Sequence, residues 1–472
     1  MSLWRSILDA ALESTARASL RLMGRDINAD EDKLLPQSDR DEVVNRCHDL
    51  RRNNPVAAGV AEGLADNVVG SRLMLQARTS DRKWNADAEA WFRAWAGNCE
   101  TSGRCNFAEV VRHAVRARLF DGELFCIPQP DGKLTLVESQ RVRPEAGSNQ
   151  AYRLDAAGRV TAWRIADRDP RTGEVTDTSP ARWVPSAFHV AWRWRPDQVR
   201  GWPQLATVAN AMQDLGEINA ANLKKYKMGA LAAWCLTGGG RLKGRNTTKS
   251  DSAHPLSSFR DGMIYELEEG QQLQPFQNNQ PGGEYSPFVE LNLRLIGMAV
   301  RLPYEFLLQY FGGGTFASSK AALEQVHVTV AAWQDWIEDA LIRPVMAWRV
   351  AEAIRRKELP PAPVDSRGRS EWDRWQWQRP AVMWLDPQAA IQAEMQEIRM
   401  GVGTLTAAAA ERGLDLEETF RQRAAEMRMA ADIEEEYGLA AGSLSDIQIP
   451  GQTPTPAAPV EETPPTETEA AQ

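Results

Sequence analysis

Two aspartates are the first residues whose type and spacing could do chemistry. Asp167 and Asp169 form an Asp-x-Asp pair, and paired carboxylates can hold the divalent cation that metal-dependent nucleases use. Arg168 lies between them and Arg171 follows, so the same residues also suit a salt-bridged turn. We favour the turn and keep a metal-dependent nucleic-acid enzyme as an alternative.

A second candidate metal site combines two thiols with an imidazole. Cys99, Cys105 and His113 could supply three zinc ligands. Five residues separate the two cysteines, whereas zinc knuckles space them by roughly two to four, and no fourth ligand stands nearby. We therefore expect buried thiols, with no metal.

A glycine run followed by basic residues could cradle a phosphate. Gly238-Gly239-Gly240 precedes Arg241, Lys243 and Arg245. The run follows a predicted helix where a phosphate loop follows a strand, and it lacks the Gly-Lys-Ser/Thr ending. The five histidines are dispersed, and none stands beside a Ser or Cys in a nucleophile motif. The sequence thus predicts no catalytic residues, no cofactor and no enzyme; function would come from geometry and partners.

Length and charge set further bounds. A chain of 472 residues is too long for one compact core. Nine of its 64 acidic residues and none of its 55 basic ones lie in 432–472, so the rest is neutral. A basic DNA-gripping domain is not expected, and nucleic-acid contacts should be local or loose.

The number of cysteines and the length of the apolar runs indicate in which cellular compartment the protein folds. Five cysteines give no even disulfide framework, which suits a reducing cytosol. The longest conspicuous uncharged apolar stretch, 228–240, is too short to span a bilayer. Seventeen Trp against seven Tyr indicate either large cores or extensive subunit contacts.

Hydrophobic periodicity predicts a helix-dominated, mixed α+β chain. An N-terminal arm (1–38) precedes an α+β lobe (39–200). The lobe should hold two helices split at Asn54-Pro55, a strand at 73–77, helices at 84–96 and 106–120, and short strands near 124–127, 134–137, 159–165 and 188–190.

The second half predicts long helices around a small excursion. A helix over 201–236 leads to a β-rich tip (237–285), with strands near 262–267 and 273–276, and a second helix returns over 286–302. An apolar loop (303–318) contains Phe306, Leu307, Leu308, Tyr310, Phe311, Gly312, Gly313 and Gly314. A long helix (319–358) kinked at Pro344, a connector (359–379), helices near 387–400, 404–412 and 416–436 within 380–436, and a disordered acidic tail (437–472) complete the chain.

Several short motifs, in this order, resemble the lambda-type portal proteins of tailed bacteriophages. They are Arg51-Arg52-Asn53-Asn54-Pro55, Asp66-Asn67-Val68-Val69-Gly70, Asp121-Gly122-Glu123-Leu124-Phe125, Gly201-Trp202-Pro203, Ala220-Ala221-Asn222-Leu223-Lys224, Arg301-Leu302-Pro303-Tyr304-Glu305, Phe316-Ala317-Ser318-Ser319-Lys320-Ala321-Ala322-Leu323-Glu324, Trp384-Leu385-Asp386-Pro387 and Gly403-Thr404-Leu405-Thr406. Each motif alone is weak, whereas their order over some 350 residues is specific.

The resemblance implies a subunit with a wing, a long-helix stem, a small β-rich clip and a helical crown. Such subunits form a ring, usually a dodecamer, at one capsid vertex of the virion, after assembly in the host cytoplasm. Double-stranded DNA passes through its channel without sequence specificity. Implied partners are the terminase large subunit, the major capsid and scaffolding proteins, and head-completion or neck proteins; no membrane is involved.

The resemblance also assigns roles to two segments. The residues from Phe306 to Gly314 would form the channel loop, with apolar side chains against DNA and the three glycines as a hinge. Arg241, Lys243 and Arg245 would face terminase at the clip. The remaining alternative, besides the nucleic-acid enzyme, is a monomeric virion assembly adaptor.

Overall fold

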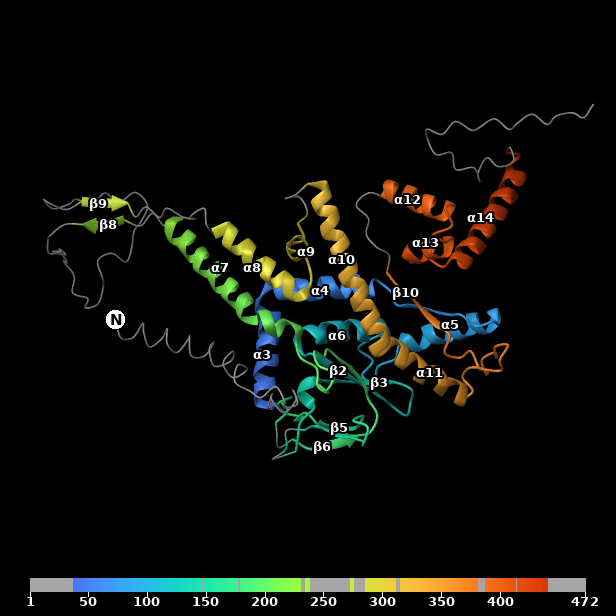
Figure 1. The fold of residues 1–472 in the computed structure, drawn as a ribbon, viewed down its shortest axis with the longest axis horizontal. Helices are drawn as coiled ribbons and strands as arrows, with labels where there is room; N and C mark the ends of the chain where they lie inside the picture. The colour runs from blue at the N-terminus through green and yellow to red at the C-terminus, as the bar shows by residue number, and fades with distance from the viewer. Residues whose placement is uncertain are drawn as a thin grey trace, which may run out of the picture. The chain divides into compact units, whose positions relative to one another are not determined.

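The computed structural model describes residues 37–145, 148, 150–176, 179–230, 234–237, 272–275, 285–310, 315–380, 387–412 and 414–439. These residues form a helix-dominated, mixed α+β structure (Figure 1), as the periodicity predicts. The chain divides into two compact units, one ending at Pro387 and the other beginning at Gln388. The predicted arm lies outside the described residues, except for its last two positions.

The first two helices meet at a capped boundary. α3 (Gln37–Asn53) and α4 (Pro55–Val69) are separated by Asn54, whose side chain accepts from the backbone amides of Val56 and Ala57. Proline at the first helical position has no amide to leave unsatisfied. The predicted split at Asn54-Pro55 is therefore confirmed.

The main core forms where α4 packs on α6 (Phe107–Phe120), with α5 (Arg82–Ala96) alongside. A capping box between Asn106 and Glu109 begins α6. Leu64, Phe107 and Leu119 are completely enclosed in this core. The helices predicted at 84–96 and 106–120 are thus present.

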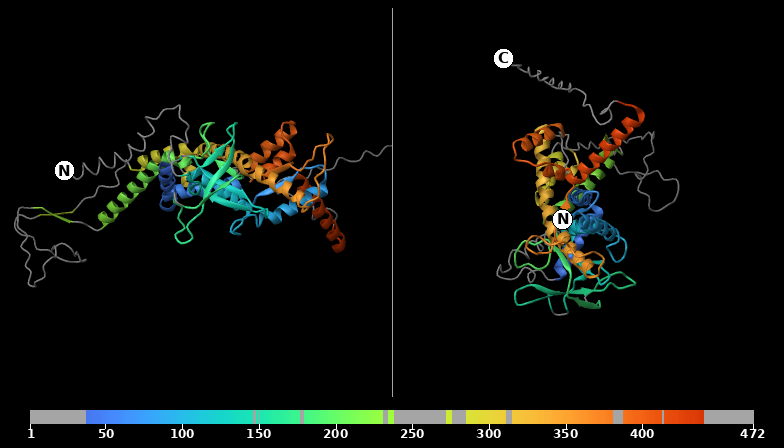
Figure 2. Two further views of the ribbon diagram at one scale, coloured as in Figure 1. Left: turned by 90° about the horizontal axis from the view of Figure 1, so that it is seen from below. Right: turned by 90° about the vertical axis from the view of Figure 1, so that its right-hand side faces the viewer.

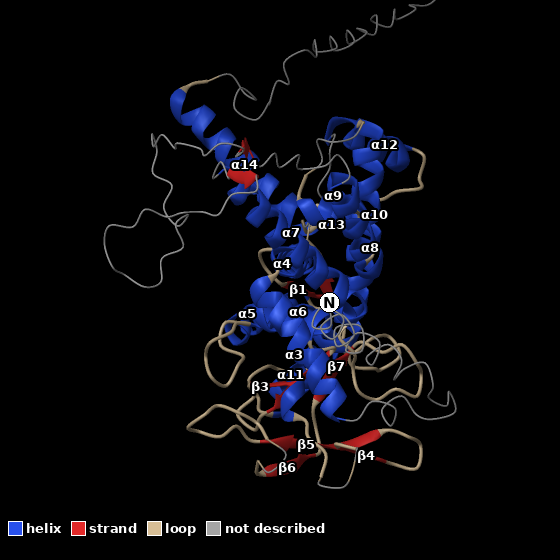
Figure 3. Cartoon of the chain, turned by 90° about the vertical axis from the view of Figure 1, so that its left-hand side faces the viewer, coloured by secondary structure: helices blue, strands red, loops and turns tan. Residues whose placement is uncertain are grey.

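Two three-stranded antiparallel sheets lie beside the helices. In the first, β2 (Glu123–Pro128) is central between β3 (Leu134–Glu138) and β7 (Phe188–Ala191). In the second, β5 (Val160–Ala166) is central between β4 (Tyr152–Leu154) and β6 (Ala181–Val184). Figure 3 shows the second sheet beyond the first, away from the helices. The four predicted strands are present, while the short edge strands β4 and β6 were not predicted.

One pairing joins residues far apart in the sequence. β1 (Met74–Ala77) pairs with β10 (Trp375–Gln378), with Leu75 opposite Trp377. The segment 359–379, predicted as a connector, therefore contains a strand near its end. Trp377 is buried in the main core, which explains part of the tryptophan excess.

Two helices leave the core side by side (Figures 1 and 2). The short 3₁₀ segment η2 (Gln204–Val208) leads into α7 (Ala209–Ala230), which packs against α8 (Tyr285–Val300). The side chain of Tyr285 donates to Asn219 across this pair. A long helix and a return helix are confirmed.

The far end of the first long helix corrects the prediction. The predicted helix extends to 236, but its last residues form the strand β8 (Trp234–Thr237). β8 pairs antiparallel with β9 (Gln272–Pro275). An apolar run without proline is consistent with helix or strand, and Trp, Cys and Thr favour the strand. The strand predicted at 273–276 is confirmed within one residue, whereas the one at 262–267 lies outside the described residues.

The next segment holds one short helix and one long, interrupted one. α9 (Tyr304–Leu308) occupies part of the predicted loop, which is therefore wrong as a loop at these residues. α10 (Phe316–Ile337) continues through the π-helical turn η3 (Glu338–Ile342) into α11 (Arg343–Arg355). The π turn lies just before Pro344, which has no amide to donate to the preceding turn. The kink expected at Pro344 stays a prediction.

The second unit contains α12 (Pro387–Arg399), α13 (Leu405–Glu411) and α14 (Leu416–Tyr437), close to the predicted ranges. Thr404 caps α13 through the amide of Ala407. Arg412 ion-pairs with Glu394 of α12. The acidic tail from residue 440 lies outside the described residues.

Candidate functional site

A buried carboxylate marks the point where the α+β lobe joins the long helices. Glu123, at the start of β2, is 1% exposed. Its oxygens accept from Nε of Arg200 at 2.7 Å, the amide of Gly201 at 2.8 Å and the hydroxyl of Ser139 at 3.1 Å. His189 Nε2 lies 2.8 Å from the same carboxylate.

Paired charges keep this carboxylate ionised. Burial alone would raise the pKa of Glu123, but Arg200 and the hydrogen bond with His189 hold that pKa well below its usual range. Burial lowers the pKa of His189 despite its bond to Glu123. The His189 ring stacks on Phe125, with centroids 4.4 Å apart. The cluster fixes Arg200 and Gly201, the residues that lead into η2.

Two glycines let the backbone segments approach closely at this junction. Gly122 has φ +81°, a left-handed conformation that favours glycine. A Cβ at Gly201 would overlap the carbonyl of Gly122 and lie 2.8 Å from Cβ of Glu123. Trp192 donates its backbone amide to Gly122 at 2.9 Å. Two motifs that carried the sequence resemblance, at 121–125 and 201–203, therefore meet in space.

An arginine enclosed by tryptophans forms the other half of the junction. The guanidinium carbon of Arg118, on α6, lies 3.7 Å from the ring centroids of Trp192 and Trp333, and 4.6 Å from that of Trp336. Burial, followed by the charge of Arg301, lowers the pKa of Arg118 to about 9, so the group stays charged at neutral pH. Desolvated cation–π contacts of this kind contribute about 2 kcal/mol.

Gln204 connects this arginine to both long helices. Arg118 Nε donates to the Gln204 side-chain oxygen at 3.2 Å, and Gln204 Nε2 donates to the carbonyl of Ala299, on α8, at 3.2 Å. Gln204 itself belongs to η2, the segment that begins α7. Asn54 adds a bond from its Nδ2 to the Met212 carbonyl of α7 at 2.8 Å. The junction can thus hold α7, α8 and α10 in fixed positions on the lobe.

The structure divides the predicted channel-loop residues into two groups. Phe306 packs near Gly63, where an added Cβ would lie 3.3 Å from the ring, and Leu307 is 9% exposed in the core. α9 turns both side chains toward the core of the subunit, and the channel role that the resemblance implies for them stays a prediction. Leu308 and Tyr310 are exposed at 47% and 59%. Phe311, Gly312, Gly313 and Gly314 lie outside the described residues.

Backbone strain brackets α9. Arg301 and Gln309 have φ of 60° and 52°, in the left-handed region that costs a residue other than glycine about 1 kcal/mol or more. The Thr329 hydroxyl on α10 donates to the Arg301 carbonyl at 2.7 Å. α9 is therefore held between α8 and α10 by defined contacts.

The two long helices expose apolar side chains. On α8, one face is buried through Leu293, Ile296 and Val300, while another face is exposed. The exposed side chains recur at helical spacing: Phe288, Leu291, Leu295 and Met298. Leu223 and Tyr226 of α7 are also about half exposed. These six residues are called the stem apolar surface below.

The sequence-predicted metal candidates do not assemble into sites. Asp167 pairs with Arg141 at 3.4 Å, whereas Asp169 accepts from the amides of Arg171 and Thr172 within its own turn. Burial raises the pKa of Cys99 to about 12, which favours the thiol over the metal-binding thiolate. Among the described residues, no cluster of three or more His, Cys, Asp or Glu is arranged to hold a metal.

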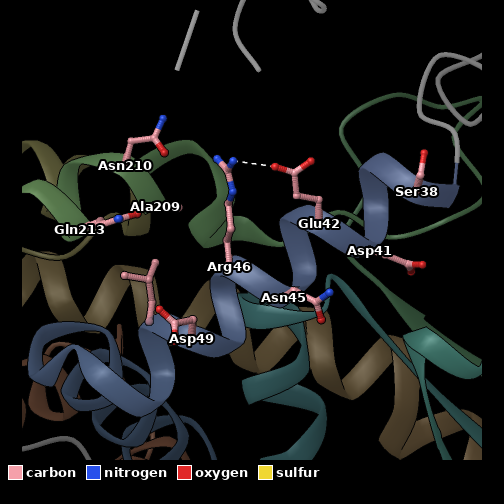
Figure 4. Close-up of a pocket in the computed structure, with 10 residues that line it drawn as sticks. Ser38, Asp41, Glu42, Asn45, Arg46, Asp49, Ala209, Asn210 and Gln213 are labelled. Carbon is pink, nitrogen blue, oxygen red and sulfur yellow. Dashed lines mark hydrogen bonds and ion pairs between the residues drawn. The ribbon is translucent and has the colours of Figure 1, made fainter. Parts of the chain in front are cut away.

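A polar groove of about 580 Å³ lies between α3 and the start of α7 (Figure 4). Its rim carries an ion pair between Arg46 and Glu42 at 2.6 Å. Asn210 and Gln213 contribute amides from α7. The groove shows hydrogen-bonding groups without a nucleophile–base pair among its lining residues.

The remaining candidates fall outside what the structure describes, or were missed. Arg241, Lys243 and Arg245 lie outside the described residues. The sequence does not identify Arg118 and Glu123 as junction residues, although Glu123 and Gly201 both lie in motifs that carry the family resemblance. In the described part of the chain, no helix combines the length and apolar character required to cross a bilayer.

Comparisons with known proteins place this geometry in a family. The family model described as "Phage portal protein, lambda family" matches residues 21–334. The portal protein of Escherichia phage N15 is 22% identical, and portal protein B of Escherichia phage lambda is 23% identical; each alignment covers 83% of this chain and 84% of the relative. The solved neck of a native gene transfer agent particle, computed with C12 symmetry, has a TM-score of 0.42 and 13% identity, covering 78% of this chain and 93% of that chain.

The family match spans more than half of the chain. It includes α3 to α8, the junction around Arg118 and Glu123, and most of α10. The chain belongs to the lambda family of phage portal proteins.

Proposed function

We propose that this portal protein is one subunit of a closed ring, usually a dodecamer, at a capsid vertex, and that double-stranded DNA passes through the ring. The observation that carries the proposal is the stem apolar surface. Four large side chains along one helix face are costly to leave in water, and a head-to-tail copy of the same chain can cover them.

The described elements suit the parts of such a subunit. We assign the wing to α3 through β7 with α10 and α11, the stem to α7 and α8, the clip to the segment containing β8 and β9, and the crown to α12, α13 and α14. The junction around Arg118 and Glu123 would keep the stem at a fixed angle to the wing. A ring closes only when every subunit has the same angle.

The charge of the chain suits a conduit through which DNA slides. Each phosphate that a protein neutralises tightens binding and makes it more dependent on salt. Residues 1–431 carry no net charge, so their overall charge would not hold DNA in the channel. DNA contact would be independent of sequence.

We assign the channel wall to the segment around α9. Leu308 and Tyr310, which are exposed, would contact DNA, while Phe306 and Leu307 anchor α9 to the core. Gly312, Gly313 and Gly314 would act as the hinge. Replacing all three by alanine should impair genome packaging or retention and leave rings intact, as assayed by packaged DNA per particle. Unchanged packaging and retention would contradict the hinge assignment.

The subunit would perform no bond-breaking chemistry. ATP hydrolysis would belong to the terminase large subunit, docked where Arg241, Lys243 and Arg245 lie in the clip. Capsid, scaffolding and neck proteins would contact the ring in the virion and during assembly in the host cytoplasm. The separation of Asp167 and Asp169 into different contacts disfavours the metal-dependent enzyme.

A further inference from the structure

We propose that a second cavity, between α3 and α6, binds a phosphoryl oxyanion. The cavity has a volume of about 300 Å³ and is lined by four arginines and two histidines. Its basic residues are His48 and Arg51 from α3, His113 and Arg116 from α6, and Arg141 and Arg168 from the segments beyond β3 and β5. Its lining contains only two carboxylates, Asp121 and Glu138.

The two lining carboxylates already have partners. His48 Nε2 lies 2.8 Å from an oxygen of Asp121, and Arg168 pairs with Glu138. Neither carboxylate therefore forms an ion pair that would neutralise the charge of Arg51. In the described part of the chain, the side chain of Arg51 forms no ion pair or hydrogen bond, and neither does the side chain of His113.

Two further arginines each have one guanidinium nitrogen that is not used in a hydrogen bond within the described residues. Arg116 uses Nε and Nη2 on Glu62, and Arg141 uses Nε on the Ala166 carbonyl and Nη2 on Asp167. These contacts fix both guanidinium groups, while each Nη1 has no hydrogen bond within the described ranges. Guanidinium groups that are held in place and line one cavity are donors that phosphate oxygens prefer.

The largest charge effects on His113 come from two arginines. Partial desolvation in the cavity, followed by the positive charges of Arg116 and Arg51, lowers the pKa of His113. Donors reach the cavity from three separate elements, and a tetrahedral oxyanion can accept from more directions than a planar carboxylate. The volume admits a phosphate or a terminal phosphate monoester and is too small for duplex DNA.

The test is calorimetric titration of inorganic phosphate into the full-length protein at low ionic strength. We expect saturable binding of one phosphate per chain, weakened about tenfold in Arg51→Gln and in His113→Gln, since each removes a charged or polar donor. Both side chains are exposed and unpartnered within the described residues, so the variants should fold. Arg52→Gln is the matched control, because Arg52 is the adjacent exposed arginine of α3 and does not line the cavity.

Further titrations distinguish the source of the phosphoryl group. If the ligand is a nucleic-acid end, a short oligothymidylate with a 5′-phosphate should bind and the same oligothymidylate without the phosphate should not. If inorganic phosphate binds and neither oligothymidylate does, the ligand is the free ion. Equal weakening in Arg51→Gln and Arg52→Gln would overturn the proposal. An absence of saturable phosphate binding would also overturn the proposal. So would a result in which the cavity binds a carboxylate-bearing peptide covering residues 459–470 and does not bind phosphate.

Discussion

The guanidinium carbon of Arg118 lies 3.7 Å from the ring centroid of Trp333. This contact joins α6, in the α+β lobe, to α10, the long helix that follows α9. Trp192 covers the other side of the same guanidinium, and Gln204 accepts from its Nε. One side chain therefore connects α6 of the lobe to α10 and, through Gln204, to the start of α7.

Replacing Arg118 with lysine should destabilise the first unit by about 1–2 kcal/mol. Lysine keeps the charge but loses the planar stack between two indoles and the directed bond to Gln204. Urea unfolding followed by tryptophan fluorescence would measure the change. Arg52→Lys, on the exposed surface of α3, is the control and should leave the midpoint unchanged; equal midpoints for all three proteins would contradict the role of Arg118.

Acid should destabilise the first unit in two steps. The pKa of His189 is lowered in the folded state, so the unfolded chain takes up a proton first as pH falls below about 6.5. The pKa of Glu123 is also lowered, so its contribution is present above about 4.5 and is lost as pH falls through its folded value. Both groups make stability decrease as pH falls.

Glu123→Gln isolates the carboxylate in this pH dependence. At pH 7 the variant should lose about 3 kcal/mol, because Arg200 keeps a buried charge without its partner. Below pH 4.5 its stability should fall less steeply than that of the wild type. The control Glu290→Gln removes an exposed pair with Arg294 and should cost less than about 0.5 kcal/mol. Parallel stability curves for Glu123→Gln and wild type would contradict the assignment.

Two glycine substitutions should have opposite effects. Gly201→Ala should destabilise the protein by about 3 kcal/mol, because its Cβ would overlap the Gly122 carbonyl. Gly59→Ala should stabilise α4 by about 0.5–1 kcal/mol, since nothing lies within 4 Å of the added Cβ. Thermal unfolding of both variants gives the comparison. A tolerated Gly201→Ala would show that the junction backbones can separate without cost.

Charges on the stem apolar surface should prevent ring assembly while leaving the subunit folded. Met298 is 75% exposed and Leu291 is 56% exposed, so Leu291→Glu/Met298→Glu removes little packing within the subunit. In a ring, each glutamate would be desolvated against the neighbouring copy. Analytical ultracentrifugation should show monomers, whereas Leu154→Glu, a charge at an exposed apolar position of β4, should leave rings intact. Rings in both variants would show that another surface mediates the contact.

Helices were predictable from the sequence because their signals are local. The boundary at Asn54-Pro55 follows from capping chemistry, and α12, α13 and α14 follow from periodicity and a threonine cap. The pairing of β1 with β10 joins Leu75 to Trp377 across most of the chain, so no local pattern predicts it. β8 was missed because its apolar residues continue the preceding helical pattern.

In the candidate site, too, local features were predictable from the sequence and long-range contacts were not. The sequence predicts an apolar segment here, and Leu308 and Tyr310 are exposed in it. The inward packing of Phe306 and Leu307 depends on α4 and on the core. Arg118 occupies an ordinary position in the pattern of α6. Arg118 is a junction residue only because Trp192 and Trp333, from distant segments of the chain, pack on its guanidinium group.

Negative-stain electron microscopy of the purified full-length protein tests ring formation most directly. We expect hollow discs with rotational symmetry, and a particle mass that is a multiple of the 52.6 kDa chain. A protein that remains monomeric at high concentration, with no hollow discs in the images, would contradict the assignment of this chain as a ring subunit.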